Sequence, residues 1–193
     1  MRRPSNNPIL KWTVLVLSIF RFTGFAQGET EAMKEFNAKV KAYVELQKRV
    51  NSNVPPLARA EADPAKIPIH TKALANGIQQ ARVNAKPGDI FSPQVAQEFR
   101  QIIRNELQGK KAAKETVKTG NPTEEPATAK IALAVNAPYP EKAPLSSVPA
   151  SLLMHLPKLP DGVEYRFLGS HLILLDSMAN LIVDYILDVV PKS

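Results

Sequence analysis

The chain has 193 residues, no cysteine and a formal net charge of +7. The length predicts about one domain, and the absence of cysteine excludes disulfides, thiolate metal sites and thiol nucleophiles. A basic excess of this size favours a polyanionic partner only if it belongs to the folded part of the chain.

Residues 1–26 have the pattern of a secretory signal peptide. A basic start is followed by an apolar run at 12–20 and by small residues at a cleavage site after Ala26. The basic residues of this start are Arg2, Arg3 and Lys11. The apolar run is far shorter than the roughly 20 residues that a membrane-spanning helix needs. We therefore expect cleavage before Gln27, a periplasmic or secreted location, and no integral membrane anchor after processing.

Removal of this segment takes away four positive charges and no acid, so residues 27–193 keep a net charge of +3. A charge this small is ordinary for a soluble protein and does not indicate a nucleic-acid partner. An exported chain without disulfides fits the envelope of a Gram-negative bacterium better than a eukaryotic secreted module.

Residues 27–120 are predicted to be helical. The first helix covers 29–51, and Pro55-Pro56 ends it. Its predicted inner face consists of Met33, Phe36, Val40, Tyr43, Gln47 and Val50. The second helix begins near Asp63-Pro64, where an N-cap residue precedes proline, and it stops before 86–88. Its predicted inner face consists of Ile67, Thr71, Leu74, Ile78 and Ala81.

Ser92-Pro93 predicts the start of a third helix, and Gly109 its end. Its predicted inner face consists of Val95, Phe99, Ile102, Ile103 and Leu107. The basic segment 110–118 fits a further short helix that ends at Gly120. Three narrow apolar stripes predict helices that pack on one another as a small up-down array.

Residues 121–160 contain eight of the 17 prolines, which predicts an extended and largely irregular connector. Two stretches interrupt it. Residues 129–135 fit a strand whose face is Ile131, Leu133 and Val135, and residues 150–156 fit a single helical turn.

Residues 161–193 predict an antiparallel β-meander. Residues 163–167 alternate apolar and polar side chains, and Gly169-Ser170 has glycine first, as a type II′ hairpin turn requires. Residues 172–175 form the returning strand. The run 181–190 fits either a helix or a strand, and its many β-branched residues favour the strand. As a strand, its apolar face is Leu181, Val183, Tyr185, Leu187 and Val189.

The segment 156–186 resembles a terminal module of exported Gram-negative proteins such as the periplasmic nickel/cobalt-homeostasis family. The resemblance rests on a Leu-Pro pair, an aromatic strand, a glycine turn, an apolar strand ending in Asp and a closing Ile-Val strand. These elements are Leu159-Pro160, Tyr165, Gly169, Leu172 to Asp176, and Ile182-Val183. The resemblance implies an envelope location and a three-stranded meander, and it does not carry nickel or cobalt binding over to this chain.

The candidate partner-binding residues lie in two places. One is the third helix with its basic tail, and the other is the predicted hairpin. They are Arg100, Arg104, Lys110, Lys111, Lys114, Arg166, Gly169 and His171. The basic group fits a contact with anionic headgroups or another polyanion, and it equally fits the solvated side of a helix.

No catalytic residue is named, since the chain has no Gly-x-Ser-x-Gly elbow, no Ser-x-x-Lys and no phosphate loop. No cofactor is expected. One alternative is a metal or small-ligand binder in envelope homeostasis, with a cation site built from His171, Asp176, Asp184 and Asp188. The competing interpretation is that the same residues form a solvated polar surface. A second alternative is a hydrolase that acts on an envelope polymer.

The sequence therefore predicts an α+β protein with helices first, a proline-rich connector and a C-terminal meander. The expected function is a non-catalytic binding or scaffold role in the cell envelope. Its contact is either the hairpin edge, which can add a strand from a partner, or the basic tail of the third helix.

Overall fold

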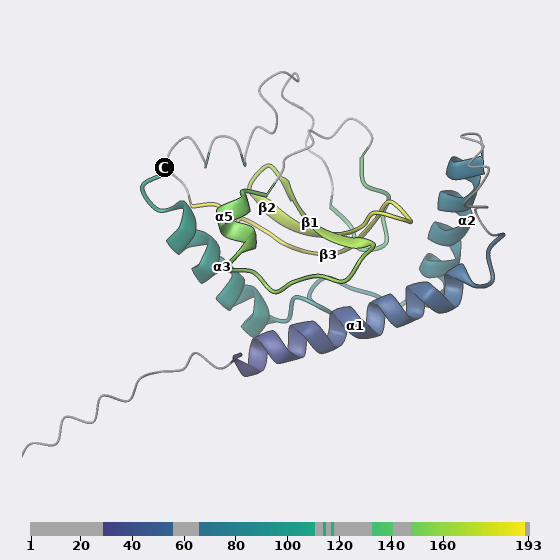
Figure 1. Ribbon diagram of the computed structural model, residues 1–193, viewed down its shortest axis with the longest axis horizontal. Coiled ribbons are helices and arrows are strands. Elements are labelled where there is room, and N and C mark those ends of the chain that lie inside the picture. The colour runs from purple at the N-terminus through teal and green to yellow at the C-terminus, as the bar shows by residue number, and fades with distance from the viewer. Residues whose placement is uncertain are drawn as a thin grey trace, which may run out of the picture.

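The computed structural model describes residues 29–55, 66–110, 114, 117, 133–140 and 148–191. These residues form an α+β fold, as predicted, in which helices cover one face of a three-stranded antiparallel sheet (Figure 1). The elements are α1 (Glu31–Asn51), α2 (Lys66–Ala81), α3 (Pro93–Leu107), α5 (Ala150–Leu153), β1 (Val163–Leu168), β2 (His171–Asp176) and β3 (Leu181–Ile186).

Helix α1 begins and faces the core as the sequence predicts. The Thr30 side chain accepts a hydrogen bond from the Met33 N–H at 3.2 Å and caps the helix. Every predicted inner residue is buried except Val50, which is partly buried and packs against the core. On the exposed side, Lys39 and Glu35 form an ion pair at 2.7 Å.

Helix α2 is only partly as predicted. Its expected start at Asp63-Pro64 lies outside the described residues, and the helix is described from Lys66. Leu74 and Ile78 are buried, but Ile67 is 45% exposed and Ala81 is also exposed, so the predicted face is wrong at both ends. His70 is buried instead, and its Nδ1 lies 2.8 Å from the Pro55 carbonyl oxygen.

Helix α3 agrees with the sequence pattern. Pro93 is its first residue, and Val95, Phe99, Ile103 and Leu107 are buried, while Ile102 is partly buried. Gly109 has a φ of +73°, which is the left-handed conformation expected after a helix C-terminus. Of the predicted basic helix at 110–118, the structure describes 110, 114 and 117, and it places the last two in helical conformation.

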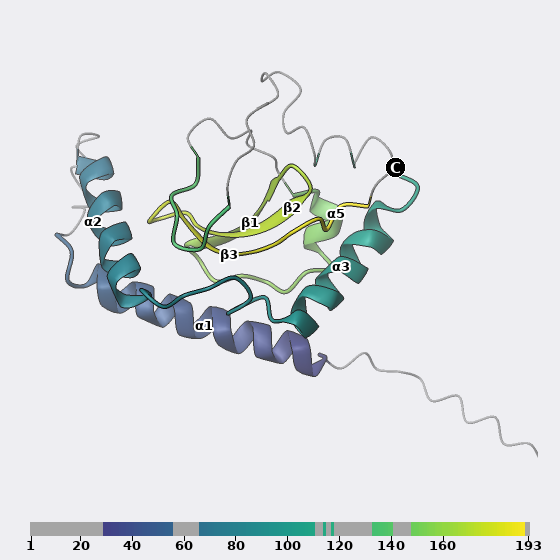
Figure 2. The ribbon, with the colours of Figure 1, turned by 180° about the vertical axis from the view of Figure 1, so that it is seen from behind.

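The predicted up-down array of helices is wrong. Helices α2 and α3 lie at opposite ends of α1, and both views show the sheet between them (Figures 1 and 2). The apolar stripes of the helices pack on the sheet, and one buried cluster contains Phe36, Phe99 and Phe167. The sheet offers a wider apolar surface than another narrow stripe does, so helices and strands share one core.

The packing of α2 on α1 depends on the small size of Gly77. A Cβ built on Gly77 would lie 2.5 Å from Val50 Cγ1, which is closer than real contacts allow. Alanine favours a helix over glycine by about 1 kcal/mol, but overpacking costs about 1–3 kcal/mol. We expect Gly77→Ala to lower the free energy of unfolding, measured by urea denaturation. Adding Val50→Ala should recover part of the loss, and a more stable Gly77→Ala protein would contradict the close packing.

The sheet has the order β1-β2-β3, and its first turn is the predicted type II′ hairpin. Gly169 has a φ of +59°, whereas Ser170 is not among the residues with positive φ. The strand alternative for 181–190 is confirmed as far as Ile186. The predicted apolar face is wrong at Tyr185 and Leu187. A bulge opposite Leu174 and Leu175 places an extra residue in β3 and turns Tyr185 toward the outer face.

The connector contributes to the sheet at a different place from the predicted strand at 129–135. The isolated bridge is Pro138 with Leu181, and Asn136 and Ala137 exchange backbone hydrogen bonds with Ile182 at 2.8 and 2.9 Å. Residues 133–135 are not in a strand, and 129–132 lie outside the described residues. The helical turn expected at 150–156 is present as the short helix α5.

Candidate functional site

The two outer strands of the sheet differ in how their edges are covered. Residues 136–139 pair with the start of β3, and the Arg82 guanidinium donates to the Val183 carbonyl at 3.2 Å. Among the described residues, no segment pairs with the outer edge of β1. Within the described part of the chain, the open edge of the sheet is therefore that of β1.

The register of the hairpin determines which backbone groups of β1 face outward. Leu168 and His171 close the hairpin across Gly169 and Ser170, so Leu168 and every second residue before it bond to β2. The remaining residues direct their N–H and C=O groups away from the sheet. They are Val163, Tyr165 and Phe167. The Val163 N–H donates to the Pro160 carbonyl at 3.3 Å, so Tyr165 and Phe167 provide the unpaired part of the edge.

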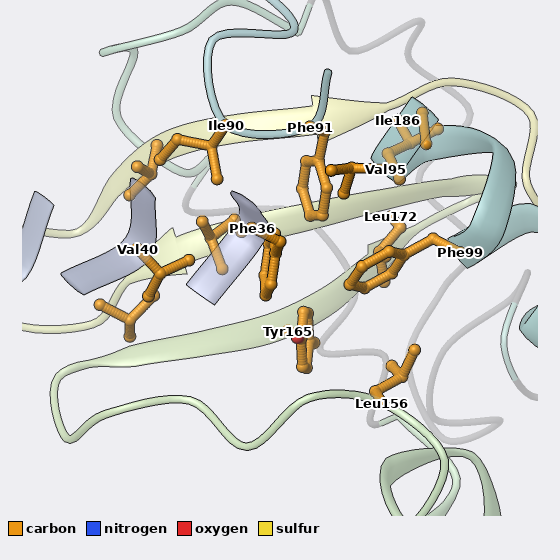
Figure 3. Packing of buried hydrophobic residues seen from close by; sticks show 14 of the residues in the cluster. Phe36, Val40, Ile90, Phe91, Val95, Phe99, Leu156, Tyr165, Leu172 and Ile186 are labelled. Carbon is orange, nitrogen blue, oxygen red and sulfur yellow. The ribbon is translucent and has the colours of Figure 1, made fainter. Parts of the chain in front are cut away.

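The chain between α5 and β1 runs beside this edge without forming a strand (Figure 3). Leu156 is buried in the core, and the Tyr165 hydroxyl donates to the Pro157 carbonyl at 3.1 Å. Pro157 and Pro160 have no N–H group to donate to a neighbouring strand. The prolines therefore hold the segment near β1 and leave the backbone of the strand unpaired.

A groove of about 470 Å³ lies between this segment and β1. Its lining is mostly apolar, with charged side chains at one side. The lining residues are Val148, Leu153, Pro157, Lys158, Leu159, Val163, Glu164, Tyr165 and Arg166. Leu153 is 46% exposed, so an apolar side chain of the groove remains open to solvent.

The charges beside the groove alternate in sign along β1. Arg166 Nε donates to Glu164 Oε1 at 2.9 Å, and its Nη2 lies 2.9 Å from the same oxygen. Both side chains are partly exposed and lie on the face of the sheet opposite to the helices. The strand thus presents one acid and one base next to an unpaired backbone.

Tyr165 gives the site a pH dependence that can be measured. Burial raises the pKa of its hydroxyl far above the ordinary value of 10.0. Above pH 10 the unfolded chain loses this proton while the folded chain keeps it, so stability falls as pH rises, by about 1.4 kcal/mol per pH unit for one group. Between pH 9 and 11, Tyr165→Phe is expected to remove about 1.4 kcal/mol of the total decline in the free energy of unfolding, as measured by urea denaturation. Parallel declines in the two proteins would contradict the assignment.

Asp184 is buried and binds the loop before α3. Its carboxylate accepts hydrogen bonds from the backbone N–H groups of Gly88 at 3.0 Å and of Ile90, Phe91 and Tyr185 at 2.8 Å. The bulge in β3 turns this side chain toward the helices. The carboxylate is therefore saturated with donors and serves the fold rather than a ligand.

Asp176 ends β2 and is buried in the same way. It accepts hydrogen bonds from the Tyr43 hydroxyl at 2.6 Å and from the Gln47 amide at 2.7 Å, and its other oxygen caps the turn at Met178 and Ala179. Burial, and then the Asp176 charge, raise the pKa of Tyr43, which keeps the hydroxyl protonated as a donor. The result is a polar contact between α1 and the end of the sheet.

The predicted cation site is not assembled. Asp188 does lie near His171, since its N–H donates to His171 Nδ1 at 3.0 Å. Asp176 and Asp184, however, have the separate partners just described. In the part of the chain that the structure describes, no three His, Cys, Asp or Glu side chains form a possible metal site.

The predicted partner-binding residues fall into two separate groups. Arg100 of α3 donates to the Leu187 carbonyl at 3.0 Å, and the neighbouring Asp188 accepts from Ser170 at 2.8 Å. The basic face of α3 therefore meets the hairpin turn that contains Gly169 and His171. Arg166 belongs to the other group, at the β1 edge.

The basic tail itself is partly neutralised. Lys110 pairs with Glu106 at 2.6 Å, whereas Arg104 is exposed. Lys114 is partly buried, and Lys111 lies outside the described residues.

Sequence reasoning did not identify the groove residues Leu153 and Leu159. The Leu-Pro pairs at 156–157 and 159–160 gave a weak signal, because proline favours an extended backbone and has no N–H group to pair with a neighbouring strand.

Comparison with models of protein families, with curated proteins and with solved structures finds no match for this chain. The resemblance of the C-terminal segment to nickel/cobalt-homeostasis proteins stays a prediction. Within residues 29–55, 66–110, 133–140 and 148–191, no helix is long and apolar enough to cross a membrane.

Proposed function

We propose that this chain is an exported, non-catalytic binding or scaffold protein of the cell envelope, and that its contact is the outer edge of β1. The observation that carries the proposal is the unpaired edge at Tyr165 and Phe167 beside an apolar groove of about 470 Å³. An extended segment of a partner adds to such an edge through main-chain hydrogen bonds, and adjacent pockets accept its alternate side chains.

The structure favours this edge over the basic tail as the contact. Two of the tail's basic side chains have partners within the chain, namely Arg100 and Lys110. The edge instead combines unpaired backbone groups with the exposed side chain of Leu153. Strand addition uses both features, because hydrogen bonds give affinity and the groove gives specificity.

Photo-crosslinking tests the contact in intact cells. A photoreactive amino acid at Leu153, which lines the groove, is expected to give a specific adduct. The matched control is the same amino acid at Met154, which is 80% exposed and does not line the groove. Equal adducts from both positions, or none from Leu153, would contradict a binding role for the groove.

A pair of variants tests the same point without a chemical label. Leu153→Asp places a charge in the groove and is expected to abolish the adduct formed from a photoreactive group at Lys158. Met154→Asp should leave that adduct unchanged. Both side chains are exposed, so neither substitution is expected to change the free energy of unfolding by more than about 0.5 kcal/mol.

Export is tested by the mass of the protein isolated from cells that express the whole chain. The signal-peptide pattern predicts a protein that begins at Gln27 and is found outside the cytoplasm. Cytoplasmic protein that retains Met1 would contradict this part of the proposal and would leave the β1 contact as a separate question.

A further inference from the structure

We infer that the segment added to β1 is the β1 strand of a second copy of this chain, so that two sheets join across a two-fold axis. The inference rests on the proposed function, because it names the occupant of the same edge. It is carried by the charges and the outward-facing residues of β1 together.

The hairpin register restricts how two β1 strands can pair. Outward backbone groups belong to Val163, Tyr165 and Phe167, so hydrogen-bonded pairs across the axis must join members of this set. An antiparallel two-fold arrangement with at least two such residue pairs can then centre on Glu164, on Tyr165 or on Arg166. Each of these registers places a different pair of charged side chains opposite one another.

Charge complementarity selects one register. Centring on Glu164 or on Arg166 places like charges directly opposite each other, which destabilises an antiparallel pair. Centring on Tyr165 places Glu164 opposite Arg166 of the second copy, and the same contact recurs on the other side of the axis. This register also pairs Tyr165 with Tyr165 of the second copy and lets the Phe167 N–H donate to the Val163 carbonyl, while the Val163 N–H keeps its bond to the Pro160 carbonyl.

The opposite charges of Glu164 and Arg166 argue against an edge that is protected from pairing with a second strand. Proteins commonly guard an edge strand with charges that repel a second strand. On β1 the two charges have opposite signs and already bond to each other at 2.9 Å, so an antiparallel copy meets attraction at both positions. Both side chains are partly exposed and are available to exchange partners.

Sedimentation of protein isolated from cells that express the whole chain tests this pairing. The wild-type protein is expected to form a reversible dimer. Glu164→Arg leaves positive side chains at both 164 and 166, and Arg166→Glu leaves negative side chains at both positions. In either variant, like charges face each other across the two-fold axis. Each variant is therefore expected to raise the dimer dissociation constant about tenfold or more. The double exchange Glu164→Arg with Arg166→Glu preserves complementarity and is expected to dimerise like the wild type.

A mixture of the two single variants gives the decisive result. The register centred on Tyr165 predicts that Glu164→Arg protein and Arg166→Glu protein associate with each other more tightly than either associates with itself. Thermal unfolding midpoints close to that of the wild type confirm that both variants fold. Failure of the mixture to associate would overturn the inference.

The two proposals fail in distinguishable ways. A wild-type chain that stays monomeric at every concentration overturns the self-pairing. In that case an adduct from Leu153 with a different protein would still support the binding role of the edge. Absence of both the dimer and the adduct contradicts the proposed function as well.

Discussion

Replacement of Asp184 by asparagine is expected to lower the free energy of unfolding by about 3–5 kcal/mol. The carboxylate is 1% exposed and accepts four backbone N–H groups, three of them from the loop before α3. Asparagine keeps one acceptor oxygen, but its NH₂ group would face two of the four N–H donors, and those two buried donors would lose their partner. Urea denaturation followed by circular dichroism measures the loss.

Asp89→Asn is the matched control for this prediction. Asp89 lies in the same loop and accepts one hydrogen bond, from the Lys86 N–H at 2.9 Å near the surface. Its replacement should cost no more than about 1 kcal/mol. Equal losses for the two substitutions would show that Asp184 has no special role in holding the loop to the sheet.

Replacement of Phe36 by alanine is expected to cost about 3–5 kcal/mol, which is the range for a buried phenylalanine. The Phe36 ring is fully buried and lies 5.4 Å from that of Phe91, 5.0 Å from that of Phe99 and 6.3 Å from that of Tyr165 between ring centroids (Figure 3). These rings come from α1, the loop before α3, α3 itself and β1. The substitution therefore opens a cavity where the helices meet the sheet.

Phe36→Leu separates the loss of volume from the loss of ring contacts. A leucine fills most of the space, so the expected loss is about 1–2 kcal/mol. Thermal or urea unfolding measures both variants. A Phe36→Ala protein as stable as Phe36→Leu would contradict the central position of this ring in the core.

The helical part of the fold was predictable where apolar residues recur with a clear period. The inner faces of α1 and α3 follow a spacing of three and four residues, and the Ser92-Pro93 pair marks where α3 begins. The hairpin was predictable because Gly169 supplies a positive φ at the first turn position. Local sequence determines each of these features.

The arrangement of the helices was not predictable from the same patterns. A narrow stripe specifies which side of a helix is buried but does not specify its partner. The bulge in β3 was also invisible, because Val183 and Tyr185 fit a regular alternation. Its consequence, a buried Asp184, has a signal in the sequence, because an acid within an apolar run needs buried donors.

The candidate site depends on an edge, and edges follow from strand order rather than from composition. The hairpin residues were recognised, but the sequence did not show that 136–139 cover β3 and leave β1 open. The grouping of His171 with Asp176 and Asp184 was wrong, because each of these two carboxylates is buried with partners of its own, whereas Asp188 does lie beside His171. The opposite charges of Glu164 and Arg166 were visible in the sequence. They indicate a pairing partner only when β1 is known to be an outer strand.

Hydrogen exchange resolved to single amides tests the open edge most directly. In dilute protein, the outward N–H groups of Tyr165 and Phe167 are predicted to exchange much faster than those of Glu164 and Arg166, which bond to β2. When the protein is concentrated or bound to its partner, the outward groups should become protected. Strong protection of Tyr165 and Phe167 already in dilute protein would contradict an open β1 edge and the binding role built on it.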